Sequence, residues 1–250
     1  MTLLFWLLSL LLGWLVGVVI NHLGTILPAK ESAFQIPYYP DSHQPRPLQA
    51  WSGLLAYFTR THHCPQSGKP LGWRYIIVEI ATPLIFLFLL LHLGQSVYLW
   101  FVWGYTAILI LLTVTDLEHR LIQNVVILPA ILLAIVGSFF TPEFTWRLAI
   151  FGGAVGFIVF YILAILARGG LGSGDVTLSA FLGLITAFPQ IILVLVLGML
   201  LGGVVSAILI VTRRVTMKTF IPYGPFLIVA GWVNLVWGDV LIRYLWPNAF

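Results

Sequence analysis

The chain has 250 residues, of which 60% are hydrophobic and only 8% are charged, and its formal net charge is +4. A soluble domain carries about 25% charged residues, so this composition excludes a protein whose surface lies mainly in water. No basic face interleaved with exposed aromatic residues is present, which argues against nucleic-acid binding. We expect membrane lipid as a partner instead, with the basic loop residues beside anionic headgroups.

Long continuous apolar runs predict transmembrane helices, because a helix needs about 20 apolar residues to cross a bilayer. Strands of a membrane barrel would alternate apolar and polar residues, so we predict an all-α fold, a polytopic transmembrane helix bundle of about eight spans. The first run lacks a basic leader segment and is interpreted as a retained span. The expected spans are residues 3–20, 76–94, 97–115, 122–140, 147–167, 174–188, 191–211 and 221–246.

The polar stretch after the first span predicts one loop domain between spans 1 and 2. We divide the chain into a first span at 1–27, a loop region at 28–75 and a transmembrane domain at 76–250. Basic residues gather in the loop region and after spans three, five and seven, whereas only Arg147 and Arg243 fall on the other side. Because cytoplasmic loops are rich in Lys and Arg, the loop region is expected in the cytoplasm.

Three acidic residues are expected near the cytoplasmic ends of spans: Glu79, Asp116 and Asp175. Carboxylates at membrane depth are costly and tend to be functional. Asp116 closes the third span and Asp175 opens the sixth, so the topology places both at the same level on the same side. Two carboxylates that share one proton can hydrolyse a peptide bond without a metal. The sequence therefore predicts an aspartic protease site.

Glycines precede the second aspartate, with Gly169, Gly170, Gly172 and Gly174 in the turn before Asp175. Glycine allows close approach of another chain, so this turn could hold an unwound substrate segment. The alternative is that these glycines serve only helix packing or a tight turn. Their position immediately before an intramembrane aspartate favours the substrate interpretation.

Simpler interpretations of the acids also exist. Asp116 could be an interfacial carboxylate that pairs with Arg120 one helical turn later. Glu79 could be a carboxylate hydrogen-bonded between helices, and we favour this slightly over a catalytic role.

Five segments in the correct order resemble the type IV prepilin peptidases, part of the Gly-x-Gly-Asp class of membrane aspartic proteases that includes presenilin. Residues 116–122 are similar to the family's first aspartate motif, and residues 172–183 to its second. Residues 221–226, Ile-Pro-Tyr-Gly-Pro-Phe, are similar to its late Pro-Phe-Gly-Pro segment. The other two segments are residues 17–21 and 73–79.

The resemblance implies that Asp116 and Asp175 are the catalytic pair and that residues 76–250 are the protease domain. It implies type IV prepilin or pseudopilin substrates, whose basic leader is removed on the cytoplasmic side of the bacterial inner membrane. Pili and type II secretion are the systems that use such products. Residues assigned to substrate positioning are Gly172, Gly174, Pro222, Gly224, Pro225 and Glu79.

The loop region departs from the family pattern. Typical members carry two Cys-x-x-Cys pairs spaced for zinc, whereas here only Cys64 is present, with Ser67 in place of its partner. A structural zinc site needs four ligands, so we expect no metal, even with His62 and His63 adjacent. Many members also methylate the new N-terminus, and the degenerate motif puts that activity in doubt. S-adenosylmethionine would be a cofactor only if methylation persists; otherwise none is expected.

Three other functions stay open. A transporter would use the intramembrane acids to carry protons or cations, but it predicts inverted repeats, and we find none. A catalytically inactive assembly factor would bind pilin-like helices, which the retained aspartates argue against. An enzyme of the same class could act on another membrane substrate. The sequence does not identify the pilin that is cut or the oligomeric state.

Overall fold

The structure is a computed structural model that describes residues 2–142, 144–166, 172–213 and 223–245. These residues form nine α-helices and one short 3-10 helix, and they contain no β-strand, only isolated bridges at Tyr38–Pro45 and His63–Pro70. The predicted all-α class is confirmed. The helices are α1 (Thr2–Ile26), η1 (Leu48–Ala50), α2 (Gly53–Phe58), α3 (Trp73–Leu93), α4 (Val97–His119), α5 (Asn124–Gly137), α6 (Trp146–Leu166), α7 (Ser173–Thr186), α8 (Gln190–Val211) and α9 (Gly224–Leu245).

Eight of these helices lie at the eight predicted spans. Within the described residues, six are long and apolar enough to cross a membrane, namely α1, α3, α4, α6, α8 and α9. The other two, α5 and α7, are apolar but have only 14 residues each. The chain is therefore a multi-pass membrane protein with a polytopic helical fold.

The chain divides into two compact units, residues 1–114 and 115–250. The predicted domain boundaries separate the loop region from the transmembrane spans. The two units are instead defined by which residues contact one another, so the loop region and α3 belong to the same unit. Helix α4 contributes to both units, and its last turn belongs to the second.

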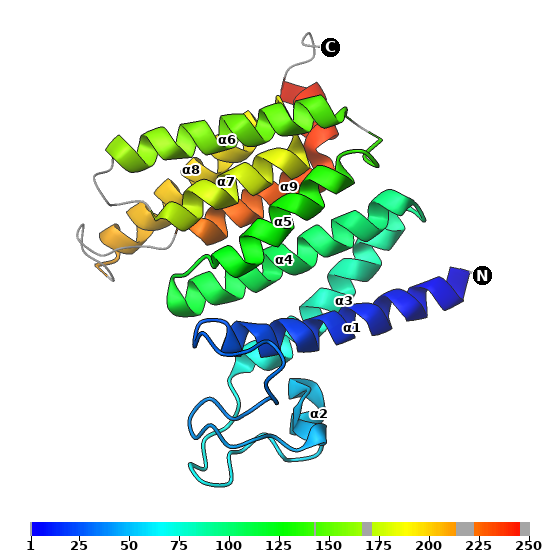
Figure 1. The fold of residues 1–250 in the computed structure, drawn as a ribbon, viewed down its shortest axis with the longest axis vertical. Coiled ribbons are helices and arrows are strands. Elements are labelled where there is room, and N and C mark those ends of the chain that lie inside the picture. The colour runs from blue at the N-terminus through cyan, green and yellow to red at the C-terminus, as the bar shows by residue number, and fades with distance from the viewer. Residues whose placement is uncertain (1, 143, 167–171, 214–222, 246–250) are drawn as a thin grey trace. The chain divides into compact units, whose positions relative to one another are not determined.

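In the first unit α1 packs against α3 (Figure 1). The backbones come close because α1 carries glycine at the contact: a Cβ on Gly17 would lie 3.1 Å from the Cα of Glu79. Trp103 connects the beginning of α4 to α3. Its indole ring stacks on the ring of Phe86, and its N–H donates a hydrogen bond of 3.0 Å to the carbonyl oxygen of Phe86.

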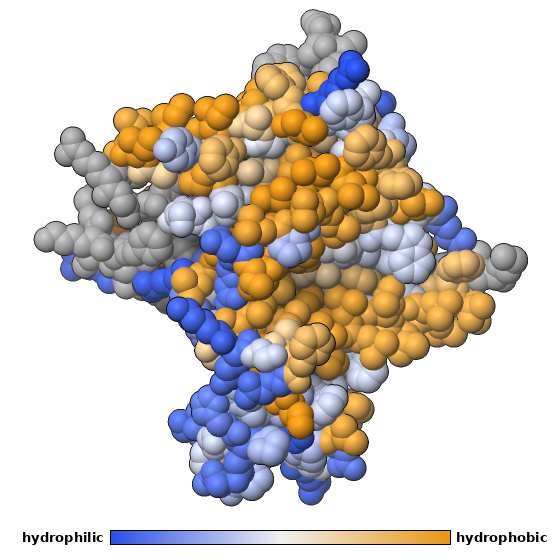
Figure 2. Space-filling view, in the orientation of Figure 1, coloured by the Kyte–Doolittle hydropathy of each residue, from blue (hydrophilic) through white to orange (hydrophobic). Residues whose placement is uncertain are grey.

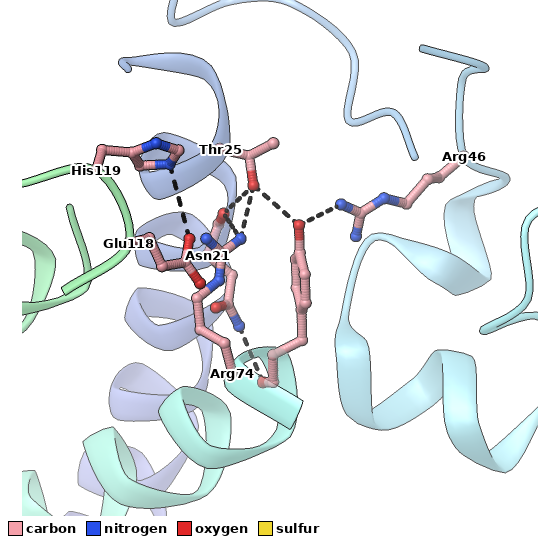
Figure 3. Close-up of polar contacts among 7 residues, drawn as sticks. Asn21, Thr25, Arg46, Arg74, Glu118 and His119 are labelled. Carbon is pink, nitrogen blue, oxygen red and sulfur yellow. Dashed lines mark hydrogen bonds and ion pairs between the residues drawn. The ribbon is translucent and has the colours of Figure 1, made fainter. Parts of the chain in front are cut away.

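A polar cluster holds the loop region on these two helices (Figure 3). Asn21 donates to the carbonyl oxygen of Tyr75 at 2.9 Å, and Arg46 from the loop donates to the Tyr75 hydroxyl at 2.8 Å. Thr25 shares a 2.9 Å hydrogen bond with that hydroxyl and accepts one from Arg74 at 2.7 Å. Helix α1 continues to Ile26, beyond the expected apolar run at 3–20 but within the first-span segment 1–27, and these contacts occupy the polar residues of its last turns.

The loop region has a small core of its own, as a compact loop domain requires. Its buried members are Tyr39, Ala50, Ala56, Cys64, Leu71 and Tyr75, the last from α3. In the face drawn in Figure 2, hydrophilic residues gather over the loop region, whereas hydrophobic residues cover most of the helices. Leucine, isoleucine and phenylalanine side chains are widely exposed on those helices, as expected for surfaces that contact lipid.

Helix α7 is the centre of the second unit and is packed by α5, α6, α8 and α9 (Figure 1). Nearly all of its residues from Asp175 onward are buried. The contact with α6 uses small residues, which let membrane helices approach closely: a Cβ on Gly152 of α6 would lie 2.5 Å from the carbonyl oxygen of Gly183 in α7. A helix of 14 residues spans only about 21 Å, and α7 can be this short because protein surrounds it instead of lipid.

Candidate active site

Asp116 lies in the last turn of α4. The helix ends at His119, and Arg120 takes a left-handed conformation (φ 55°), so its N–H donates to the carbonyl oxygen of Asp116 at 2.9 Å. The carboxyl group is buried, with 5% of the residue exposed. Its Oδ2 has no hydrogen-bond partner among the described residues, and no ion pair there joins it to Arg120. A buried, unpartnered carboxylate oxygen is costly, which points to a role beyond structure.

Asp175 lies in the first turn of α7, three residues after the N-cap Gly172. Its Oδ2 accepts a hydrogen bond of 3.3 Å from the backbone N–H of Gly172, and only 6% of the residue is exposed. The position is favourable for an acid, because the N-terminal end of a helix attracts negative charge. The N-cap hydrogen bond from Gly172 and the start of α7 thus position this carboxylate.

The two aspartates line one cavity within the second unit. Its volume is about 160 Å³, and its lining is Asp116, Arg120, Leu121, Ile122, Gly172, Ser173, Gly174, Asp175 and Tyr223. The cavity is large enough for several water molecules, since one water occupies about 30 Å³ in the liquid. The structure therefore brings the two predicted carboxylates together around a space that water and a peptide bond could enter.

The predicted positioning residues Gly174 and Gly224 lie at close contacts of this site. A Cβ on Gly174 would lie 2.7 Å from the Cβ of Ile122, and one on Gly224 would lie 2.5 Å from Oδ2 of Asp116. Gly224 begins α9, and Pro225 follows it in the first turn. Pro222 lies outside the described residues, as do Gly169 and Gly170. The described glycines thus set how closely α7 and α9 approach the segment that carries Asp116.

Gly224→Ala is expected to lower the rate constant of cleavage by about 10²-fold while the protein still folds, because a displacement of about 1 Å in a reacting group can cost that much. The new methyl group must push the Asp116 carboxylate aside. The measurement is steady-state cleavage of a prepilin in detergent. Gly203→Ala is the matched control, since a Cβ there meets nothing within 4 Å. Equal activity of the two variants would contradict the close packing of Gly224 on Asp116.

Glu79, the other predicted positioning residue, is fully buried in the first unit. Its carboxylate accepts hydrogen bonds from the Ser52 hydroxyl at 2.5 Å, the backbone N–H of Gly53 at 2.7 Å and that of Leu54 at 3.1 Å. Asn21 donates a further one at 3.2 Å. Glu79 therefore caps the first turn of α2 and ties the loop region to α3, which is the hydrogen-bonded role that the sequence also allowed.

Glu79→Gln is expected to loosen the loop region, because an amide NH₂ replaces one acceptor oxygen and leaves buried donors unsatisfied, at about 1–3 kcal/mol each. Limited trypsin digestion in detergent checks this by the rate of cutting after Arg60, which is followed by Thr61. Asp41→Asn serves as the control in the same region, since Asp41 only pairs with exposed Lys69 at 3.4 Å. Cutting as slow as in wild type would refute the capping role.

The degenerate cysteine motif forms a hydrogen-bonded turn. Cys64 shares a 3.0 Å hydrogen bond with the Ser42 hydroxyl, and its N–H donates to the carbonyl oxygen of Lys69 at 2.9 Å. Hydrogen bonds from Ser42 and Ser67 lower the pKa of the Cys64 thiol to about 7. Among the described residues no three His, Cys, Asp or Glu side chains gather closely enough to hold a metal ion.

Tyr223 lines the cavity but was not among the predicted site residues. Its hydroxyl is buried and has no hydrogen-bond partner within the described ranges. The sequence signal was available, because Tyr223 lies inside the segment 221–226 that resembles the family's late motif.

The chain is similar to known proteins of one family. The model of the type IV leader peptidase family matches residues 103–207, which include both aspartates. Similar curated proteins, each named prepilin leader peptidase/N-methyltransferase, come from Pseudomonas aeruginosa, Aeromonas hydrophila and Bacillus subtilis. They are 29%, 28% and 22% identical, and the alignments cover 95%, 96% and 76% of this chain and 90%, 92% and 77% of the relatives. No solved structure matches the chain significantly. The resemblance to the type IV prepilin peptidases that the motifs predicted is therefore confirmed over most of the chain.

Proposed function

We propose that this chain is a membrane aspartic endopeptidase that removes the leader peptide of type IV prepilins or pseudopilins, with Asp116 and Asp175 as the catalytic pair. One observation carries the proposal: two buried carboxylates from separate helices line a single cavity. That cavity lies largely in the part of the chain that matches the leader peptidase family.

The chemistry follows from the pair. Two carboxyl groups in one buried site share a proton, because both cannot easily be ionised together. The ionised group removes a proton from water, and the water oxygen attacks the carbonyl carbon of the scissile bond. The protonated group donates to the carbonyl oxygen and so makes the carbon more electrophilic. Because the pair titrates as a unit, separate acid and base roles are not assigned.

The positioning residues are proposed to shape the substrate's path. Gly172 has extended backbone (φ −75°, ψ 147°) and lines the cavity with Gly174. Small residues there leave space for a substrate backbone beside Asp175. Gly224, Pro225 and Pro222 would set the other wall, where α9 begins. Glu79 would act at a distance, by holding the loop region in place.

The site is proposed to face the cytoplasm from the bacterial inner membrane. The support is the charge bias of the loops, which carry most Lys and Arg on the side of the loop region and of the α4 exit. The short basic leader of the substrate would then bind the protease at the cytoplasmic surface of the membrane, where the leader leaves the bilayer.

Methylation is proposed to be absent. The relatives' names include N-methyltransferase, but the loop region of this chain replaces the expected second thiolate with Ser67. The peptidase activity does not depend on this region supplying a reacting group, so the proposal needs no S-adenosylmethionine.

The test uses the purified full chain in detergent with EDTA present and a prepilin that has a basic leader ending in glycine. Mass spectrometry of the product should show one cut directly after that glycine. Addition of S-adenosylmethionine should leave the product mass unchanged, and a mass increase of one methyl group would overturn the methylation proposal alone. An intact substrate with every prepilin and pseudopilin tried would refute the peptidase and favour transport or pilin binding.

A further inference from the structure

We propose that Tyr223 is a third polar residue of the reaction site, and that its hydroxyl donates a hydrogen bond to the oxygen of the scissile carbonyl as that oxygen gains negative charge. This inference rests on the proposed peptidase function and adds a residue that binds the tetrahedral intermediate. The protonated aspartate gives its proton to that oxygen during the reaction, whereas a phenol can donate a hydrogen bond throughout without losing its proton.

The place of Tyr223 in the cavity is the first support. Tyr223 lines the same cavity as Asp116 and Asp175, from the residue that directly precedes α9. Its hydroxyl oxygen is buried, as is Oδ2 of Asp116, and both atoms have no hydrogen-bond partner among the residues that the structure describes. Two polar atoms without partners at one cavity are best explained if a substrate or a water molecule forms hydrogen bonds with them.

The ring of Tyr223 is held firmly, so that its hydroxyl has a defined position. A Cβ on Gly202 of α8 would lie 2.7 Å from the Cε2 atom, which shows how closely the ring packs on that helix. Phe160 of α6 and Phe226 of α9 lie at ring-centroid distances of 6.0 and 6.4 Å. A donor fixed before the reaction is the arrangement that stabilises developing charge most effectively.

A packing role alone would not explain the hydroxyl. Phenylalanine would fill the same space between Gly202 and Phe160 without a buried polar atom, and a buried hydroxyl without a partner costs free energy. A tyrosine phenol has a pKa of about 10 in water and is therefore a donor at neutral pH. The hydroxyl of Tyr223 is accordingly assigned the role of binding the substrate.

The balanced step is as follows. The water oxygen forms a bond to the carbonyl carbon, one water proton goes to the ionised carboxylate, and the π pair of the carbonyl moves onto its oxygen. The protonated aspartate gives its proton to that oxygen, which yields a neutral diol. Tyr223 donates a hydrogen bond throughout and transfers no proton. When the diol collapses, the C–N bond breaks with its electron pair going to nitrogen, and the nitrogen takes a proton from the protonated carboxyl group. One hydroxyl of the diol gives its proton to the other, ionised carboxylate as the carbonyl re-forms, which restores the dyad.

Tyr223→Phe tests the proposal, since it removes the hydroxyl and keeps the ring. We expect kcat for prepilin cleavage to fall about 10²-fold, as for loss of one oxyanion donor, with KM unchanged. A peptide analogue that carries a tetrahedral hydroxyl at the cleaved position should bind the variant more weakly, whereas uncleaved prepilin should bind it equally well. The midpoint of thermal unfolding should equal or exceed that of wild type, because phenylalanine keeps the ring and removes an unpartnered buried hydroxyl. Tyr161→Phe is the matched control, because that side chain is exposed on α6.

Each outcome decides a separate point. If wild type and Tyr161→Phe cut the substrate and Tyr223→Phe cuts at the same rate, the Tyr223 proposal is overturned and the peptidase function stands. A loss of activity with a parallel loss of thermal stability, or a change in KM alone, assigns Tyr223 to packing or ground-state binding and also overturns it. If wild type does not cut, the peptidase function fails and this inference fails with it.

Discussion

Asp116→Asn and Asp175→Asn are each expected to lower the rate constant of prepilin cleavage by at least about 10³-fold, in the range of general acid–base catalysis. Asparagine has nearly the same shape as aspartate but cannot exchange the proton. The protein should still fold, because no described side chain donates to Oδ2 of Asp116 and an asparagine oxygen can still accept from Gly172. The measurement is single-turnover cleavage in detergent with EDTA present.

Asp239→Asn is the matched control for both variants. Asp239 lies in α9 of the same unit and accepts a hydrogen bond from Gln190 at 2.8 Å, which an asparagine oxygen can also accept. It should cut at the wild-type rate. Normal cleavage by either dyad variant would show that the reaction does not use that carboxylate.

Gly183→Ala is expected to destabilise the second unit by about 1–3 kcal/mol or more, the usual cost of overpacking. A Cβ on Gly183 would overlap the carbonyl oxygen of Gly152 and lie 2.6 Å from its carbonyl carbon. Both partners are backbone atoms, so they cannot move away as the end of a side chain does. Helix α7 would have to shift against α6, and Asp175 would move with it. Thermal unfolding in detergent measures the loss.

Gly203→Ala separates this effect from the general cost of changing a membrane glycine. A Cβ on Gly203 in α8 meets nothing within 4 Å, and alanine has a higher helix propensity than glycine. We expect its unfolding midpoint to equal or exceed that of wild type. A Gly183→Ala protein as stable as Gly203→Ala would be inconsistent with the close α6–α7 contact.

The helices and the aspartate pair could be predicted from sequence because each leaves a local signal. Continuous apolar runs mark the spans, and an acid is conspicuous at the end of such a run. Counting spans predicted that Asp116 and Asp175 lie at the same level on the same side of the membrane, and the structure adds that both line one cavity. The apolar run alone ends at residue 20, because Asn21 and Thr25 lower the hydropathy, whereas the first-span segment 1–27 contains the whole of α1 to Ile26, where both side chains contact Tyr75.

Long-range partners were the part that sequence reasoning could not supply. Nothing near Glu79 in the chain reveals that Ser52 and Gly53, more than twenty residues earlier, donate to it. Likewise, Tyr223 becomes informative only when Gly202 and Phe160 are seen to hold its ring. Sequence can identify an acid or a phenol as unusual, but which atoms surround it depends on tertiary packing.

The most direct test of the central claim, that Asp116 and Asp175 act as one unit, is the single-turnover cleavage rate of the double variant Asp116→Asn/Asp175→Asn beside the two single variants. Residues of one catalytic unit are strongly non-additive, so the double variant should be no more than a few-fold slower than the slower single variant. A double variant whose loss equals the product of the two single losses would contradict the account, because the carboxylates would then contribute independently.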